Sequence, residues 1–192
     1  MKEVFEISDS DIGLEIKNEV KYSSRSAARA VLKKGDKVAL LHVSKYNYYK
    51  LPGGGINNGE TIQEALKREI KEEAGCTFKL LNEIITIVER RSHIGLVQTS
   101  HCFLAEVIEE GDPEFTPKEI KNGFKLIWVD FNEAIDLITN NKPSHYGGRF
   151  VVARELKFLE KTRRFLNKKY QQSKTDTSEI RLLSRCLCLS LD

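Results

Sequence analysis

The sequence predicts an α/β fold in which a mixed β-sheet packs against helices, and two observations support this. Segments of strand character alternate along the chain with segments of helical periodicity. Several strand candidates are separated by turns too short for a crossover, so some neighbouring strands must be antiparallel. The 192 residues suit one domain of ordinary size, which can bury a core without disulfides.

The strands and later helices are expected in the following order. Residues 28–32 and 38–43 are apolar runs on either side of Lys34-Gly35-Asp36, so we predict a strand pair joined by a turn. Further strands are expected at 83–90, 96–108 and 124–129, and helices at 133–139 and 149–170. Residues 111–123 are rich in turn formers and lack apolar periodicity, which predicts a loop.

A helix is predicted immediately before Gly75. Thr61 followed by Glu64 forms a capping-box signal, and Gly75 is a natural left-handed stop. At about 100° per residue, one face carries four apolar side chains, namely Ile62, Ala65, Leu66 and Ile70. Glu69 and Glu73 fall within the same apolar sector, where they would face away from solvent.

Two interpretations of this acidic helix are available. Glutamates paired with Lys67, Arg68 and Lys71 would form an ordinary solvated face, but this does not explain carboxylates inside the apolar stripe. Glu69, Glu72 and Glu73 stand at i, i+3 and i+4, so without enough adjacent positive charge they should repel one another. Carboxylates gathered in this way suit a hard divalent cation, Mg²⁺ or Mn²⁺, together with water and a phosphate-bearing substrate.

The loop that leads into this helix supports the metal interpretation. Gly53, Gly54 and Gly55 follow Leu51-Pro52, and consecutive glycines let the main chain approach a ligand closely. A glycine run by itself is more often a turn. A glycine loop that leads into a candidate metal-binding helix is far more specific.

Together these residues resemble the Nudix box of the Nudix hydrolases. The match consists of Gly54, Glu60, Arg68-Glu69-Ile70, Glu72-Glu73 and Gly75 at the family spacing, and Cys76 stands where the pattern has an aliphatic residue. Cysteine packs as a small hydrophobe, so little harm is expected. The resemblance covers roughly residues 22–170, which leaves 1–21 as an N-terminal segment and 171–192 as a tail expected to be poorly ordered and to contribute nothing to the chemistry.

The resemblance implies an α/β/α sandwich and hydrolysis of a nucleoside diphosphate linked to another moiety. Glu69, Glu72, Glu73 and the carbonyl of Gly54 would hold the divalent metal. Arg68 would pair with a carboxylate of the box, and Glu60 would brace the loop against the helix. Two candidates exist for the general base, namely a box glutamate and Glu119 in the 111–123 loop.

The substrate is less defined than the reaction. Lys45, Tyr46 and Lys50 precede the glycine loop and could contact phosphate or stack on a base, but a solvated lysine and a packed tyrosine are equally good interpretations. Residues 89–94 supply neither the proline nor the tyrosine that marks two Nudix subgroups, which favours a nucleoside triphosphate, oxidised or not, as substrate. The alternatives are an ADP-ribose or other nucleotide-sugar pyrophosphatase, a non-catalytic nucleotide-sensing module, and an isopentenyl-type diphosphate isomerase. The positions of the cysteines do not support the isomerase.

Composition limits the partners. The net charge of +3 is too mild for a dedicated nucleic-acid binder, and the acidic start offers neither a signal peptide nor a membrane span. The four cysteines are too scattered for a disulfide framework, which favours a reducing cytoplasm. A homodimer is left open.

Overall fold

The computed structural model describes the backbone of residues 3–188 and the surroundings of side chains up to residue 172. Its strands are β1 (Val4–Ser8), β2 (Ser23–Lys34), β3 (Lys37–Val43), β4 (Tyr48–Lys50), β5 (Gly53–Gly55), β6 (Thr77–Arg91), β7 (Leu96–Glu109) and β8 (Phe124–Asp130). Its α-helices are α1 (Ile62–Ala74), α2 (Pro117–Lys121), α3 (Phe131–Thr139) and α4 (Tyr146–Cys188). Short 3₁₀ turns are η1 (Asp9–Ile12), η2 (Ser44–Tyr46) and η3 (Ser92–Ile94).

The strands form one mixed sheet, as the sequence predicted. Its order is β1-β6-β7-β2-β3-β4, with β5 paired to β2 and β8 paired to β3. The pairs β1/β6 and β2/β7 are parallel, whereas the remaining pairs are antiparallel. The two predicted apolar runs around Gly35 are the paired strands β2 and β3.

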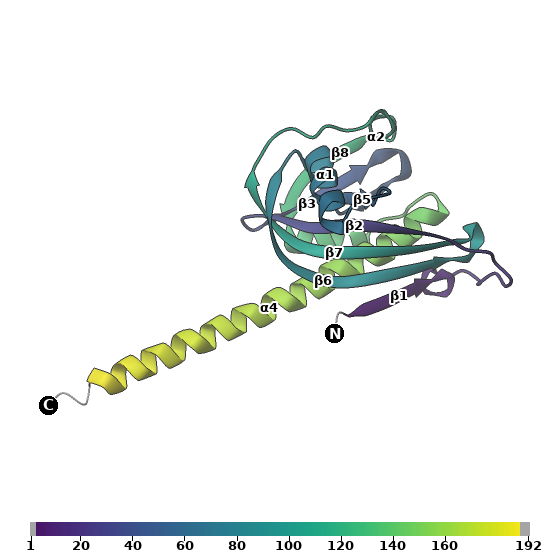
Figure 1. Ribbon diagram of the computed structural model, residues 1–192. Coiled ribbons are helices and arrows are strands. Elements are labelled where there is room, and N and C mark those ends of the chain that lie inside the picture. The colour runs from purple at the N-terminus through teal and green to yellow at the C-terminus, as the bar shows by residue number, and fades with distance from the viewer. Residues whose placement is uncertain (1–2, 189–192) are drawn as a thin grey trace.

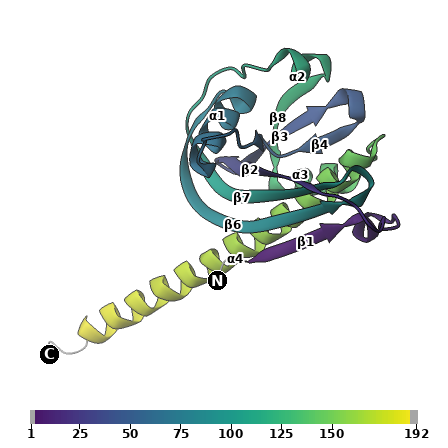
Figure 2. The same cartoon turned by 45° about the vertical axis from the view of Figure 1, so that its right-hand side comes forward.

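Helices cover both faces of the sheet, which gives the expected α/β/α sandwich. On one face α1 packs through Leu66 and Ile70 against Ala28 and Leu32 of β2. On the other face α3 and α4 bury a second cluster that includes Ile138, Phe150 and Phe158. Both views show α1 and α4 on opposite sides of the sheet (Figures 1 and 2). Odd-numbered residues of β2, including Arg29, therefore face α4.

The α1 helix forms where its end signals place it. The Thr61 side chain accepts a hydrogen bond from the Glu64 amide, and Glu64 caps the Thr61 amide in return. Gly75 ends the helix at φ 67°, and a Cβ there would lie 2.3 Å from the Gly111 carbonyl oxygen, so only glycine fits.

Several features depart from the sequence prediction. The glycine loop contains the short strand β5, the residues before it form β4, and β6 begins at Thr77 and not near residue 83. The N-terminal segment, for which no element was predicted, contributes β1, and Ile7 on it is buried. The predicted loop 111–123 contains the short helix α2. The last helix was expected to end near residue 170 but continues to Cys188, because residues 171–188 contain neither glycine nor proline to stop it. Residues 189–192 of the predicted tail lie outside the described residues.

In the part of the chain that the structure describes, no helix combines the length and the apolar composition that crossing a bilayer requires.

Candidate active site

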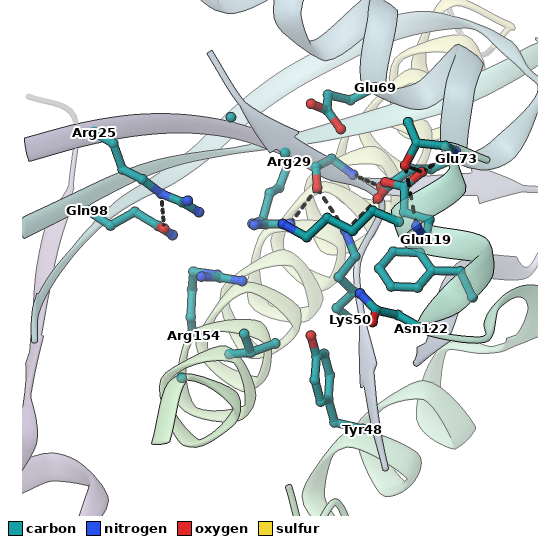
Figure 3. Close-up of a pocket in the computed structure, with 18 of the residues that line it drawn as sticks. Arg25, Arg29, Tyr48, Lys50, Glu69, Glu73, Gln98, Glu119, Asn122 and Arg154 are labelled. Carbon is teal, nitrogen blue, oxygen red and sulfur yellow. Dashed lines mark hydrogen bonds and ion pairs between the residues drawn. The ribbon is translucent and has the colours of Figure 1, made fainter. Parts of the chain in front are cut away.

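A pocket of about 410 Å³ lies where the glycine strand β5, α1, α2 and α4 meet. Glu69 and Glu73 reach it from α1, Glu119 from α2 and Lys50 from β4, and all three glycines of β5 line it (Figure 3). The pocket thus brings together the glycine loop and two of the three box glutamates.

Glu73 is the most deeply buried of the box glutamates, with 1% of its surface exposed. It accepts a hydrogen bond from the Lys50 ammonium at 2.7 Å and another from the Gly53 amide at 2.6 Å. Burial nevertheless raises the pKa of Glu73 above its ordinary value, against the lowering effect of Lys50. The prediction that Glu73 faces away from solvent is confirmed.

Glu69 is held by Arg68. The Arg68 guanidinium donates to Glu69 at 2.8 Å, to Glu60 at 2.7 and 3.0 Å, and to the Gly55 carbonyl at 2.9 Å. Arg68 also lies 3.4 Å from Glu72. The hydrogen bonds from Arg68 are the main reason that the pKa of Glu60 is lowered to about 2. Arg68 and Glu60 therefore fasten the loop to α1, the arrangement that the resemblance implied.

One part of the sequence argument is wrong. The box carboxylates were expected to lack enough adjacent positive charge, with Arg68 pairing with one of them, but Arg68 contacts both Glu69 and Glu72, and Lys50 contacts Glu73. Lys50 is distant from α1 in sequence and meets it only because β4 lies beside the glycine loop. Repulsion among the carboxylates is therefore offset in the structure.

The donor set fits a hard divalent cation in its chemistry. An added Cβ on Gly54 would lie 2.4 Å from a carboxylate oxygen of Glu69, so Glu69 occupies the space that a side chain at residue 54 would fill. Glu69, Glu73 and the Gly54 backbone thus offer oxygen atoms side by side, whereas Glu72 does not line the pocket. Among the described residues, no three acidic, histidine or cysteine side chains already converge on a metal position. The carboxylates turn toward Arg68 and Lys50 instead.

Glu119, the second candidate base, also lines the pocket. Its Oε2 accepts hydrogen bonds from the amide and the hydroxyl of Thr116, each at 2.8 Å, in the capping box of α2. The cap therefore fixes the position of Glu119 on the same side of the pocket as α1.

The residues expected to bind substrate fall into two groups. Lys50, Gly53, Gly54 and Gly55 line the pocket, but Lys45 and Tyr46 do not. Lys45 is exposed, 3.4 Å from the Asn122 side-chain oxygen, and Tyr46 packs edge-on against His145. Tyr48 lines the pocket together with Lys50, because alternate residues of β4 point inward, whereas Tyr46 lies before this strand in η2.

Four arginines of the pocket were missed by the sequence analysis. Arg25 and Arg29 come from β2, Arg91 from β6 and Arg154 from α4, and together we call them the arginine cluster. A signal was present, since Arg29 interrupts an apolar strand and Arg154 lies midway between Phe150 and Phe158 at helical spacing.

Comparison with known proteins defines the class. The family model of the NUDIX domain matches residues 23–148, which is more than half of the chain. The chain therefore belongs to the Nudix family and is a Nudix-type pyrophosphohydrolase, an enzyme class that generally uses divalent metal ions.

Named relatives agree with this assignment. An RNA pyrophosphohydrolase of Sulfurovum sp. (strain NBC37-1) is 32% identical over 109 residues, which are 52% of this chain and 69% of that protein. Diphosphoinositol polyphosphate phosphohydrolase 2 of Rattus norvegicus is 28% identical over 111 residues, 57% of this chain and 59% of its own. The structure of C. elegans Ap4A hydrolase matches 75% of this chain and 99% of its own at a TM-score of 0.52 and 22% identity, which supports the fold.

Proposed function

We propose that this chain hydrolyses a diphosphate bond in a nucleoside diphosphate linked to another moiety, most readily a nucleoside triphosphate that releases a nucleoside monophosphate. The observation that carries the proposal is the buried Glu69 carboxylate lying against the Gly54 backbone inside the pocket. The two sequence relatives named above are, by name, hydrolases of phosphorylated compounds, which supports the same chemistry.

We assign the roles of the box residues from the family resemblance, and the contacts of Glu69 and Glu73 in the pocket are compatible with them. Glu69, Glu72, Glu73 and the Gly54 carbonyl would hold Mg²⁺ or Mn²⁺, which when bound offsets charge on the diphosphate oxygens and lowers the pKa of an attacking water. Arg68 keeps the Glu69 carboxylate oriented from the side of the loop. Glu119 or a box glutamate accepts the proton of the water, and the pocket position of Glu119 is compatible with this role.

The pocket also provides for binding. Its volume of about 410 Å³ is within the usual range of small-molecule sites. Tyr48 and Phe124 line it and could contact a base or a sugar, and Lys50 lies beside the glycines. Two free cysteines, Cys76 and Cys102, are buried and are compatible with the proposed cytoplasmic location.

The test is a substrate screen with the purified full chain. Nucleoside triphosphates, ADP-ribose, dinucleotides and sugar nucleotides are incubated with Mg²⁺, with Mn²⁺ and with a chelator. We expect metal-dependent release of a nucleoside monophosphate from at least one compound, and release that is slower by about a hundredfold or more with Glu69→Gln. Tight nucleotide binding without cleavage of any compound would contradict the proposal and indicate a sensing module.

A further inference from the structure

The arginine cluster collects four guanidinium groups on one side of the pocket. Arg25, Arg29 and Arg154 point toward the same space (Figure 3). Arg91 also lines this pocket. Three of the four are buried, with exposed fractions of 5% for Arg29, 8% for Arg91 and 1% for Arg154. Arg25 lies at the exposed edge of the pocket, where the Gln98 side-chain oxygen holds its Nε at 2.7 Å.

Two buried carboxylates neutralise only part of this charge. Glu89 accepts from Arg91 and from Arg154, each at 3.0 Å, and Glu155 accepts from Arg154 at 2.6 Å and lies 3.9 Å from Arg29. Four guanidinium groups thus face two carboxylates, which leaves a surplus of two positive charges in the cluster. Charges removed from water are costly unless they are paired, so this surplus favours an anion.

Unused hydrogen-bond donors point to the same conclusion. In the described part of the chain, the buried side-chain atoms without a hydrogen-bond partner are the Nε atoms of Arg29, Arg91 and Arg154 and Oε2 of Glu155, so donors outnumber acceptors three to one. Buried donors in native proteins are normally satisfied, and those that are not mark a missing partner such as an ion or a ligand. Burial, followed by the charge of Arg154, lowers the pKa of Arg29, as expected for a cation without full compensation.

The arginine cluster and the box glutamates meet at one residue. The Gly53 carbonyl accepts from Arg29 at 2.6 Å and from Lys50 at 3.0 Å, whereas the Gly53 amide donates to Glu73 at 2.6 Å. A single residue, Gly53, therefore separates the proposed metal site from the nearest arginine. One substrate molecule can reach both.

We propose that Arg25, Arg29, Arg91 and Arg154 form a second anion subsite, which takes a phosphoryl group of the substrate other than the two joined by the cleaved bond. The proposal rests on the proposed function and narrows it to phosphate-rich substrates. The additional phosphoryl group has two sources: the terminal phosphate of a longer phosphate chain, or a monoester on a sugar. A dianionic phosphoryl group matches the surplus charge, and guanidinium groups bind phosphate oxygens in the bidentate manner that phosphate recognition favours.

Binding is tested first without metal or turnover. Inorganic phosphate is titrated into the full chain in the presence of a chelator, and affinity is measured by calorimetry. We expect Arg25→Gln and Arg91→Gln to weaken binding by about tenfold or more, because each removes a charged hydrogen-bond donor. Arg25 is exposed, so its variant should fold normally even if Arg91→Gln is destabilised by loss of its contact with Glu89.

Arg90→Gln is the matched control, since Arg90 precedes Arg91 in β6 but its side chain is half exposed on the other face. Its phosphate affinity should equal that of the wild-type protein. Equal affinity of wild type and Arg25→Gln, or no phosphate binding by wild type at millimolar concentration, would overturn the proposal.

Kinetics then distinguish the two sources of the phosphoryl group. ATP is compared with ADP, which lacks the terminal phosphate, and NADPH with NADH, which lacks the ribose monoester. The informative pair is the one in which the wild type prefers the compound with the additional phosphate. For that compound, Arg25→Gln should raise KM by about tenfold with little change in kcat. For the compound without the additional phosphate, KM should change much less. A preference that survives in Arg25→Gln would contradict the subsite. If wild type cleaves none of the four compounds, the proposed function is weakened for these substrates, while the phosphate titration still decides on the subsite.

Discussion

The two ends of the pocket are built in different ways. The acidic end, consisting of Glu69, Glu73 and the glycines of β5, comes from one continuous stretch between Gly53 and Glu73. The arginine cluster comes from two strands and a helix, between Arg25 and Arg154. At both ends, charged residues interrupt apolar sequence patterns, and oppositely charged side chains neutralise part of their charge. A short-range motif thus identifies a class of chemistry, whereas long-range contacts decide which molecule the site can accept.

The largest effect should come from neutralising the acidic end. Glu69→Gln should reduce kcat by about a hundredfold or more because it removes a charge that would hold the metal, while Arg68 keeps its contact with Glu60 and the fold. Glu73→Gln should reduce kcat similarly and in addition lower the metal-free unfolding free energy by about 3 kcal/mol, since it leaves the Lys50 ammonium buried without an anion. Turnover with Mg²⁺ and urea unfolding with a chelator measure the two quantities.

The double variant Lys50→Met/Glu73→Gln separates the two roles of Glu73. It should recover most of the lost stability, because replacing both members of a buried pair is often neutral, but it should recover no turnover. Near-normal metal-dependent turnover in Glu69→Gln or Glu73→Gln would show that these carboxylates are structural and not catalytic.

The glycine loop gives the next largest effect and separates catalysis from folding. A Cβ on Gly54 would meet the end of the Glu69 side chain, which can shift, so Gly54→Ala should displace that carboxylate and lower kcat by about tenfold to a hundredfold with little loss of stability. Gly53 has φ +126°, and its Cβ would lie 2.3 Å from the Ala28 carbonyl oxygen, so Gly53→Ala should destabilise the fold by about 1–3 kcal/mol. Melting temperature and kcat of both variants are compared. Equal behaviour of the two would contradict this division.

A smaller effect is expected from acid titration of Glu60. Arg68 depresses the pKa of Glu60 from 4.5 to about 2, so the ion pair contributes stability above pH 4.5 that is lost as the pH falls toward 2. The wild-type melting temperature should therefore fall more steeply over this interval than that of Glu60→Gln. Glu106→Gln, at an exposed residue of β7, is the control and should keep the wild-type slope. Parallel curves for wild type and Glu60→Gln would argue against a folded-state role of the pair.

Substitution on the solvated side of α1 should have a minor effect. Lys71 is exposed and its ammonium makes a long 3.5 Å contact with the Gly75 carbonyl. Lys71→Ala should change the unfolding free energy by no more than about 0.5 kcal/mol and leave turnover unchanged. A large loss would mean that the burial pattern of α1 is misassigned.

The smallest effect is expected from removing the end of the chain. The pocket is lined by residues up to Arg154, so a chain that ends at Gln172 should keep kcat and melting temperature. That residues 171–192 contribute nothing to the chemistry stays a prediction until this truncation is measured. A marked drop in either quantity would show that the end of α4 contacts the domain or another subunit.

The sequence determined the local part of this protein. The bounds of α1, the pairing of β2 with β3 and the burial of Glu69 and Glu73 were predictable, because capping boxes, turns and helical periodicity act over a few residues. The Nudix resemblance was visible for the same reason, since its metal-binding groups lie on one loop and one helix.

Tertiary structure decided what pairs with these groups and what shares their pocket. The sequence gives no reason for Lys50 to meet Glu73, or for Arg25, Arg29, Arg91 and Arg154 to surround one space, until the sheet order places β2, β4 and β6 against α4. The N-terminal strand β1 was missed likewise, because it is ordered by pairing with β6 and not by a pattern of its own. Strand pairing joins residues that are far apart in the chain, and its free energy depends on partners that a local pattern does not contain.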